Sequence, residues 1–416
     1  MTTGALADRR RDVRVIGILG VVHLFSHFYQ LSLAPLFPLI SRDLDISNLE
    51  LGFFVSLFYI ASGTLQTPAG FLVDRVGARP VLLGGLGLLS LAVAGYSLAP
   101  SYGVMAVLLV LAGAGNSVFH PADYSMINQS VHSRLVGRAY SIHGVGGHAG
   151  FALAPVVIAP LALWLGWRGA LAAAGLTGVA LVLLLLMGGG KALQGSREQA
   201  ERPARDGRQS KENPIAVLLK PSILAFFVFF TLFAMATIGL QNFTAAALVM
   251  ERGVSLLSAS AALAGFLVAA PIGILVGGVI ADRAHRHHDL IATGGFVGAG
   301  LFLLAIPVFT LDGNFLLGAL ALAGFLFGTT LPNRDLIIRR ATPPGASGRV
   351  FGFIYCGLDI GSAVTPTLYG WFLDLGNPRW IFIGSGLLLL AAALLVVVTA
   401  RLMAAAGDDH RRETAA

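Results

Sequence analysis

Residues 381–400 read IFIGSGLLLLAAALLVVVTA and contain no charged side chain over twenty consecutive positions. A run of this length crosses the hydrocarbon core of a bilayer, about 30 Å thick, as a single α-helix. Similar apolar runs recur along the 416 residues, of which 56% are hydrophobic and only 12% are charged. Because an ordinary soluble domain carries about 25% charged residues, the chain is predicted to be an all-α membrane protein that crosses the bilayer many times.

Hydropathy predicts twelve transmembrane helices, at 15–40, 49–72, 81–99, 104–128, 138–163, 168–188, 222–248, 257–280, 290–311, 315–338, 349–372 and 380–403. The first run is not a signal peptide, because it continues to Ile40 and follows four arginines. The longest polar segment, 191–220, contains two prolines and is predicted to be a cytoplasmic linker. It separates an N-terminal six-helix bundle at 1–190 from a C-terminal six-helix bundle at 221–416.

The basic residues give the predicted orientation. Of the 28 Lys and Arg residues, 24 lie in segments on one side of the alternating spans, and the positive-inside rule makes that side cytoplasmic. Both termini are therefore predicted to be cytoplasmic, in a multi-pass protein of the cell (inner) membrane. These loops account for the net charge of +7, so no nucleic-acid partner is expected. The single cysteine, Cys356, excludes an internal disulfide.

Two patterns occur once in each half and predict that the two bundles are pseudo-symmetric. The stretch from Gly70 to Arg75 returns 208 positions later as Gly278 to Arg283. A longer pattern returns 211 positions later, from Pro121, Gly137, Arg138, Gly146, Gly150 and Pro155 to Pro332, Gly348, Arg349, Gly357, Gly361 and Pro366. Each copy keeps a Gly-x-x-x-Gly pair, which allows a neighbouring helix to approach closely. Internal repeats of this kind are typical of transporters that place one site between two moving halves.

The sequence GFLVDRVGARP at 70–80 resembles the signature loop of the major facilitator superfamily of secondary transporters, and the resemblance covers nearly the whole chain. The stretches 116–123 and 144–150 are similar to the fosmidomycin-resistance type of drug exporters, although this chain has Ala122 and then Asp123 where an acid beside the proline motif is expected. The resemblance implies that the signature loop holds the two halves together through charge contacts in one conformation. The gating residues that it implies are Gly70, Asp74, Arg75, Gly77 and Arg79, with Asp282 and Arg283 in the second copy.

Ionisable side chains inside membrane spans are costly and are functional candidates by default. Asp359, predicted to be buried in the eleventh span, is the carboxylate deepest in the membrane and the leading candidate for a proton carrier; the alternative is a fixed hydrogen bond within the protein. His148, its counterpart 211 positions earlier, is a second candidate. His120 and Asp123, three positions apart on one helix face, form another possible proton site, unless Asp123 lies at the wet cytoplasmic end. His143, at the start of its span, is a weaker candidate that could be solvated.

Several polar residues in the spans are predicted to contact the transported compound. They are His23, His27, Gln30, Asn116, Gln241, Asn242 and Arg334. The resemblance implies that most of these helices line a central cavity. The alternative for the uncharged groups is ordinary hydrogen bonding between helices, worth about 1 kcal/mol. No metal site is predicted, because two histidines four positions apart need further ligands that converge on them.

Asp123 and Arg334 occupy corresponding positions of the repeat, 211 apart. One hypothesis is that the opposite charges form an inner gate that closes the cytoplasmic side. The other is that Arg334 binds an anionic cargo and Asp123 titrates with His120.

The sequence contains no nucleophile with its base and no phosphate-binding loop, so neither an enzyme nor a cofactor is predicted. The leading function is proton-coupled export of a small amphipathic or drug-like compound by a monomer that binds its cargo, protons and the lipid bilayer. The alternative is proton-coupled uptake of an organic anion or sugar acid. A receptor or scaffold without transport is disfavoured by the titratable groups within the spans.

Overall fold

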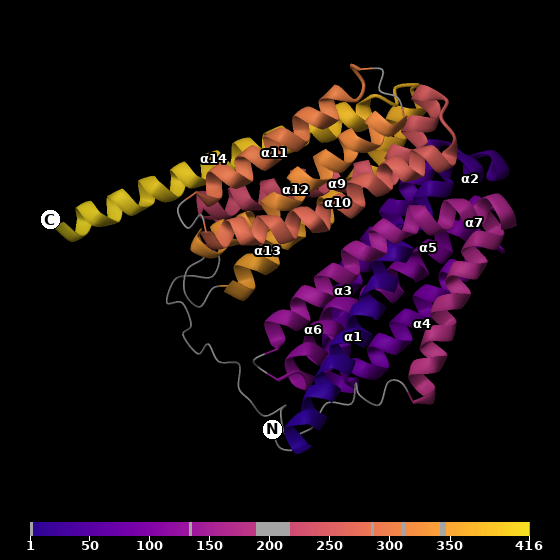
Figure 1. Cartoon of the computed structure of the whole chain (residues 1–416), viewed down its shortest axis with the longest axis horizontal. Helices are drawn as coiled ribbons and strands as arrows, with labels where there is room; N and C mark the ends of the chain where they lie inside the picture. The colour runs from indigo at the N-terminus through magenta and orange to yellow at the C-terminus, as the bar shows by residue number, and fades with distance from the viewer. Residues whose placement is uncertain are drawn as a thin grey trace. The chain divides into compact units, whose positions relative to one another are not determined.

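The computed structural model describes residues 3–132, 135–188, 217–283, 287–309, 313–341 and 347–415. All regular elements among these residues are helices, which confirms the predicted all-α fold. The chain divides into two compact units, residues 1–203 and 204–416, drawn in Figure 1 from indigo to magenta and from orange to yellow. The predicted linker lies outside the described residues except for its last four positions.

The first unit contains α1 (Thr3–Gln30), the short 3-10 helix η1 (Ala34–Leu36), α2 (Phe37–Leu44), α3 (Asn48–Val76), α4 (Ala78–Tyr96), α5 (Tyr102–Asn116), α6 (Phe119–Ser130) and α7 (Val136–Met187). The 52-residue α7 is two helices joined at Gly166, whose φ of 68° suits a residue without a Cβ. The second unit contains α9 (Pro221–Arg252), α10 (Leu256–Arg283), α11 (His288–Ala305), α12 (Gly313–Ala341), α13 (Ser347–Asp374) and α14 (Trp380–Ala415).

Within the described residues, ten helical segments are long and apolar enough to cross a membrane. One of the ten is α7, which contains both the fifth and the sixth predicted span on either side of Gly166. The eleventh predicted span is helical as α13 but is not among the ten, because Asp359 and its glycine, threonine and proline neighbours lower its mean hydropathy. The chain is therefore a multi-pass helical membrane protein.

Two predicted spans are interrupted. The first was expected to run from 15 to 40, but α1 ends at Gln30 and the chain continues through η1 into α2. Pro35 and Pro38 begin these short helices, where the missing backbone N–H costs least. The fourth span is divided into α5 and α6, because Pro121 cannot donate a backbone hydrogen bond to the carbonyl of Ser117. His120 and Asp123 therefore lie on a short helix of their own.

The repeated glycines make equivalent close contacts in both units. A Cβ on Gly146 or Gly150 of α7 would collide with the backbone of α1, at Gly20 and Leu24. A Cβ on the repeat counterparts, Gly357 and Gly361 of α13, would collide with the backbone of α9 at Phe227 and Thr231. Since the contacted residues are 207 positions apart in both cases, α1 and α9 correspond, and His23 corresponds to Phe230.

Each unit also contains an ion pair, and the two pairs lie at corresponding positions. Arg168 of α7 pairs with Asp43 of α2 at 2.8 Å, and Arg379, just before α14, pairs with Glu251 of α9 at 2.5 Å. The two arginines are 211 positions apart, and the two acids 208. The four basic residues predicted to lie outside the cytoplasm are Arg42, Arg168, Arg252 and Arg379. Arg168 and Arg379 each join the end of one helical segment to the start of another within their own unit.

Candidate functional site

A polar stripe runs along α1. His23, Ser26, His27 and Gln30 are spaced at i, i+3, i+4 and i+7 and therefore share one helix face. The glycines of α7 bring its backbone against this part of α1, so side chains at the contact can reach each other. Since polar groups inside a membrane protein need partners, the partners of the stripe identify the site.

The carboxylate of Asp123 is the most deeply buried charged group of this region, with 0% of its surface exposed. Its Oδ2 accepts a hydrogen bond from Nε2 of His143 at 2.9 Å. His143 is itself only 3% exposed, so the expectation that it could be solvated is wrong, as is the alternative that Asp123 lies at a wet helix end. The pair joins α6 to the first part of α7.

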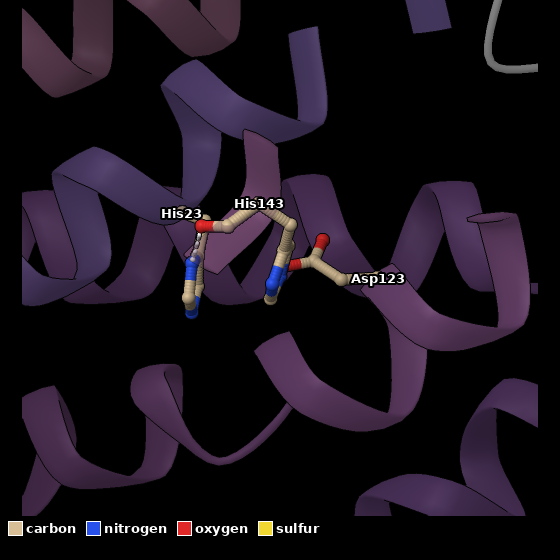
Figure 2. A group of neighbouring side chains, drawn as sticks. All are labelled: His23, Asp123 and His143. Carbon is tan, nitrogen blue, oxygen red and sulfur yellow. Dashed lines mark hydrogen bonds and ion pairs between the residues drawn. The ribbon is translucent and has the colours of Figure 1, made fainter. Parts of the chain in front are cut away.

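His23 completes a buried cluster of three residues with this pair. Its Nδ1 lies 2.7 Å from the backbone carbonyl oxygen of His143, and the two imidazole rings stack with centroids 3.5 Å apart. Figure 2 shows the ring of His143 between the ring of His23 and the carboxylate of Asp123. Because a carbonyl only accepts, Nδ1 of His23 carries the hydrogen, and Nε2 of a neutral ring is an acceptor.

His27 extends the cluster along α1. Its Nε2 lies 3.0 Å from Nε2 of His23, and its ring packs edge-on against Phe151. Gly147 makes room for both histidines, since a Cβ there would lie 2.8 Å from Cε1 of His23 and 3.1 Å from Nε2 of His27. The site therefore depends on a glycine that belongs to no repeated pair.

His120 lies beside the cluster but makes no hydrogen bond to Asp123 among the described contacts. Its ring centroid is 5.7 Å from that of His23 and 6.4 Å from that of His143. Unlike the buried Asp123, its side chain is exposed. The predicted partner of Asp123 on the same helix is thus replaced by His143 from the following helix.

Two residues predicted to contact cargo are joined in a hydrogen-bond network. Asn116 Oδ1 accepts from Ser26 at 2.7 Å and from Gln30 at 3.3 Å, while Asn116 Nδ2 donates to Ser62 Oγ at 2.9 Å. The network connects α1, α3 and α5. These contacts agree with the bonding between helices that the sequence left as the alternative for both residues.

In the second unit, Arg334 is 8% exposed and lies over the rings of Phe230 and Phe233, with its guanidinium carbon 4.9 Å and 5.0 Å from their centroids. Asn242 donates to the carbonyl of Ile238 at 2.9 Å. The side-chain oxygens of Gln241 and Asn242 are buried and accept no hydrogen bond among the described residues. These two amides keep acceptor capacity that the fold does not use.

Asp359 lies on the exposed face of α13, together with the neighbouring Tyr355, Cys356 and Ile360. Position 359 lies on the face of α13 that turns away from the core of its unit. Among the described residues its carboxylate makes no hydrogen bond or ion pair. Its repeat counterpart His148 is half-buried and bonds through Nδ1 to the carbonyl oxygen of Gly144 at 3.0 Å.

The signature stretch lies where α3 ends and α4 begins. Gly77 has φ 99° and separates the two helices, a conformation that disfavours any residue with a Cβ. Gly70 has open space around it, and Arg75 and Arg79 follow on either side of the turn. Arg283 ends α10 in the second copy; the side chains of Asp74 and Asp282 lie outside the described residues.

The sequence singled out His23, Asp123 and His120 but gave least weight to His143. A signal was present: His143 precedes Gly146, Gly147 and Gly150 by three, four and seven positions, so it shares the helix face that packs against α1. Ser26 and Ser62 were missed because serine is common in membrane helices and carries no pattern of its own. The ring nitrogens of His23 and His143 and the carboxylate oxygens of Asp123 can hold a proton or ligate a cation.

A family model described as Major Facilitator Superfamily matches residues 16–334 and 231–414. The chain is 27% identical over 383 residues to the Fosmidomycin resistance protein of Escherichia coli (strain K12), covering 87% of this chain and 88% of that protein. It is also 28% identical over 144 residues to the Probable L-galactonate transporter of the same strain, covering 35% of this chain and 32% of that protein.

Among solved structures, the chain is similar to a bacterial homologue of the human lysosomal transporter Spinster, crystallised in an inward-facing and occupied conformation. The TM-score is 0.70 at 15% sequence identity, over 95% of this chain and 96% of that chain. At this identity the similarity shows the fold.

Proposed function

Because the chain belongs to the Major Facilitator Superfamily, whose members are secondary transporters, we propose that it exports a small amphipathic or drug-like compound in exchange for protons. In this proposal the two repeated units expose the cargo site alternately to the two sides of the membrane. The free energy comes from the proton gradient, because the chain has no phosphate-binding loop for ATP.

Similarity over most of the chain supports export. The relative that covers 87% of this chain is named for resistance to fosmidomycin, and removal of a toxic compound from the cell is one way in which a transporter gives resistance. At 87% of the chain, the match extends over both units. The L-galactonate relative covers about a third of the chain and carries less weight.

The observation that carries proton coupling is the placement of Asp359. Its carboxylate is near the middle of α13, on the face that turns away from the core of its unit, and has no partner among the described residues. An ionised aspartate at the centre of a transmembrane helix costs about 2.5–3.5 kcal/mol on insertion scales, so a carboxylate placed there without a partner among the described residues is expected to have a function. Protonation removes the charge of the Asp359 carboxylate. The free-energy cost of carrying this residue from one side of the membrane to the other is then lower.

Asp359→Asn tests this role. In proteoliposomes with an imposed pH gradient and fosmidomycin as the first probe, we expect the variant to lose gradient-driven accumulation and to retain exchange of labelled probe. Asp359→Glu keeps a carboxyl group and should retain part of the gradient response. A full gradient response in Asp359→Asn would remove Asp359 from the role of proton carrier.

A second candidate function is uptake of an organic anion or sugar acid. It is favoured by the buried guanidinium of Arg334 on its aromatic platform and by the L-galactonate relative. A growth screen separates the two functions. Export predicts that a strain lacking the transporter is sensitised to toxic compounds such as fosmidomycin, whereas uptake predicts that it fails to grow on particular acids as sole carbon source.

The orientation in the inner membrane is also a proposal, supported by the 24 basic residues on one side. In a Cys356→Ser background, we expect Gln209→Cys in the linker to be protected from an impermeant thiol reagent added to intact cells. Asn377→Cys, between α13 and α14, should react. Labelling of Gln209→Cys from outside would reverse the orientation and place both termini outside the cytoplasm.

A further inference from the structure

The histidine and aspartate cluster of the first unit has the composition of a metal site. We propose that His23, His143 and Asp123, with His27 as a fourth ligand, bind one divalent transition-metal ion of the Zn²⁺ class. One potential ligand atom from each of His23, His143 and Asp123 lies within 4.8 Å of the other two, and all three residues are buried. The inference does not depend on proton-coupled export, since it concerns a different unit from Asp359.

The distances fit a site that closes around an ion with small movements. Ligands about 2.0–2.1 Å from a tetrahedral zinc ion lie roughly 3.3 Å from one another. Here Nε2 of His143 and Oδ2 of Asp123 are 2.9 Å apart, and Nε2 of His27 and Nε2 of His23 are 3.0 Å apart. Both pairs would open slightly, and rotation of the stacked rings would bring the two pairs towards a common centre.

The surroundings of His23 match those of a metal ligand. A ligating histidine usually donates its other ring N–H to a carbonyl or carboxylate, which sets the tautomer and the direction of the free nitrogen. Nδ1 of His23 donates in this way to the backbone carbonyl of His143 at 2.7 Å. Nε2 of His23 consequently accepts the hydrogen of His27 Nε2, and a metal ion would take the place of that hydrogen once His27 carries its hydrogen on Nδ1.

Asp123 supplies a second observation. The carboxylate is fully buried, and its Oδ1 accepts no hydrogen bond among the described residues. No lysine or arginine pairs with Asp123 in the described part of the chain, and its ion-pair partner there is the imidazole of His143. A divalent cation would supply the compensating charge that a buried carboxylate requires.

The donor set selects the class of ion. Imidazole nitrogen suits zinc, copper, iron and nickel, whereas magnesium and calcium prefer oxygen ligands. Three imidazoles and one carboxylate therefore favour Zn²⁺ over Mg²⁺ and Ca²⁺. Because the ligands come from α1, α6 and α7, the ion would cross-link three separate segments of the first unit.

Zinc binding to the purified full-length protein, with any histidine tag removed, tests the site. Competition with a chromogenic chelator should give one Zn²⁺ per chain, with no competition from Mg²⁺ or Ca²⁺ in excess. We expect His143→Gln and Asp123→Asn each to weaken Zn²⁺ binding by about 100-fold or more, because loss of outer-shell partners alone costs 10–100-fold. His148→Gln, five positions further along α7 and outside the cluster, is the matched control and should change affinity less than threefold.

X-ray absorption at the zinc edge gives a readout that does not depend on the folding of variants. The expected first shell is nitrogen and oxygen at about 2.0–2.1 Å, with the scattering pattern of imidazole. Absence of saturable Zn²⁺ binding would overturn the proposal and assign the cluster to proton sharing alone. Binding that survives both cluster variants and disappears in the His285→Gln, His287→Gln double variant would overturn it in favour of the histidine-rich stretch at 285–288.

Discussion

The two halves of the molecule pack in the same way but carry opposite chemistry at corresponding positions. In the first unit, Asp123 meets the imidazoles of His143 and His23. In the second unit, the counterpart Arg334 lies over Phe230, the counterpart of His23, and over Phe233. A buried carboxylate surrounded by imidazoles is thus matched by a buried guanidinium surrounded by phenyl rings.

The contrast extends to the residues around these two sites. Asn116, which joins a hydrogen-bond network in the first unit, corresponds to Phe327, whose ring stacks on Phe233 with centroids 5.2 Å apart. The helix contacts are nevertheless equivalent, because they depend on glycines that both halves retain. The comparison teaches that backbone packing and site chemistry are separable here: small residues preserve the first while side chains around them diverge.

The largest expected effect concerns charge exchange between the halves. The double variant Asp123→Arg, Arg334→Asp should be as inactive as the worse of its two single variants in a transport assay. The physical reason is that Asp123 has its partner, His143, within its own unit, and the aromatic rings around position 334 favour a cation. Recovery of transport in the double variant would support the inner gate and make the two positions partners across the halves.

Breaking the buried pair should destabilise the first unit strongly. His143→Leu removes the hydrogen-bond partner of Asp123 and leaves a buried carboxylate uncompensated, which typically costs about 3–5 kcal/mol. Adding Asp123→Leu removes the stranded charge, so the double variant should unfold at a higher temperature than His143→Leu alone. Thermal unfolding in detergent without added metal measures both. Equal stability of the single and double variants would show that the carboxylate does not need the imidazole.

The repeated glycines should respond alike in both halves. Gly150→Ala and Gly361→Ala place a Cβ against the backbone of α1 and α9, respectively, and overpacking typically costs roughly 1–3 kcal/mol. Gly144→Ala is the matched control, since a Cβ there meets nothing within 4 Å. Thermal unfolding measures the three variants. A large loss in one half only would break the structural equivalence on which the comparison of sites rests.

The repeated ion pairs should matter least. Asp43→Asn and Glu251→Gln remove one partner from each pair, and exposed pairs contribute about 0.2–1 kcal/mol. Of the two acids, Asp43 is the more solvated, with 46% of its side chain exposed against 16% for Glu251. We therefore expect the smaller loss of unfolding temperature for Asp43→Asn, and a larger loss for Asp43→Asn than for Glu251→Gln would contradict this ranking.

Sequence patterns predicted the helices well where a single local property decides them. The spans on α3, α4, α10 and α14 follow from hydropathy, and the glycine pairs that bring helices together follow from the repeat. The breaks at η1 and before α6 were missed, although Pro35 and Pro121 are visible in the sequence. A long apolar run does not reveal whether a proline is accommodated inside a helix or ends it, because the neighbouring helices decide that.

The sequence by itself determined that the chain is a helical membrane protein with two related halves, since length and hydropathy of each run are enough to exclude a soluble fold. Only the tertiary structure decided which polar side chains meet. His23 contacts the backbone of His143 across 120 positions, and Asp359 turns away from the core of its unit. Both outcomes depend on the rotation of each helix about its axis, which is set by close packing against its neighbours; the glycines beside His143 mark one packing face, but they do not show which side chains of α1 and α6 meet it.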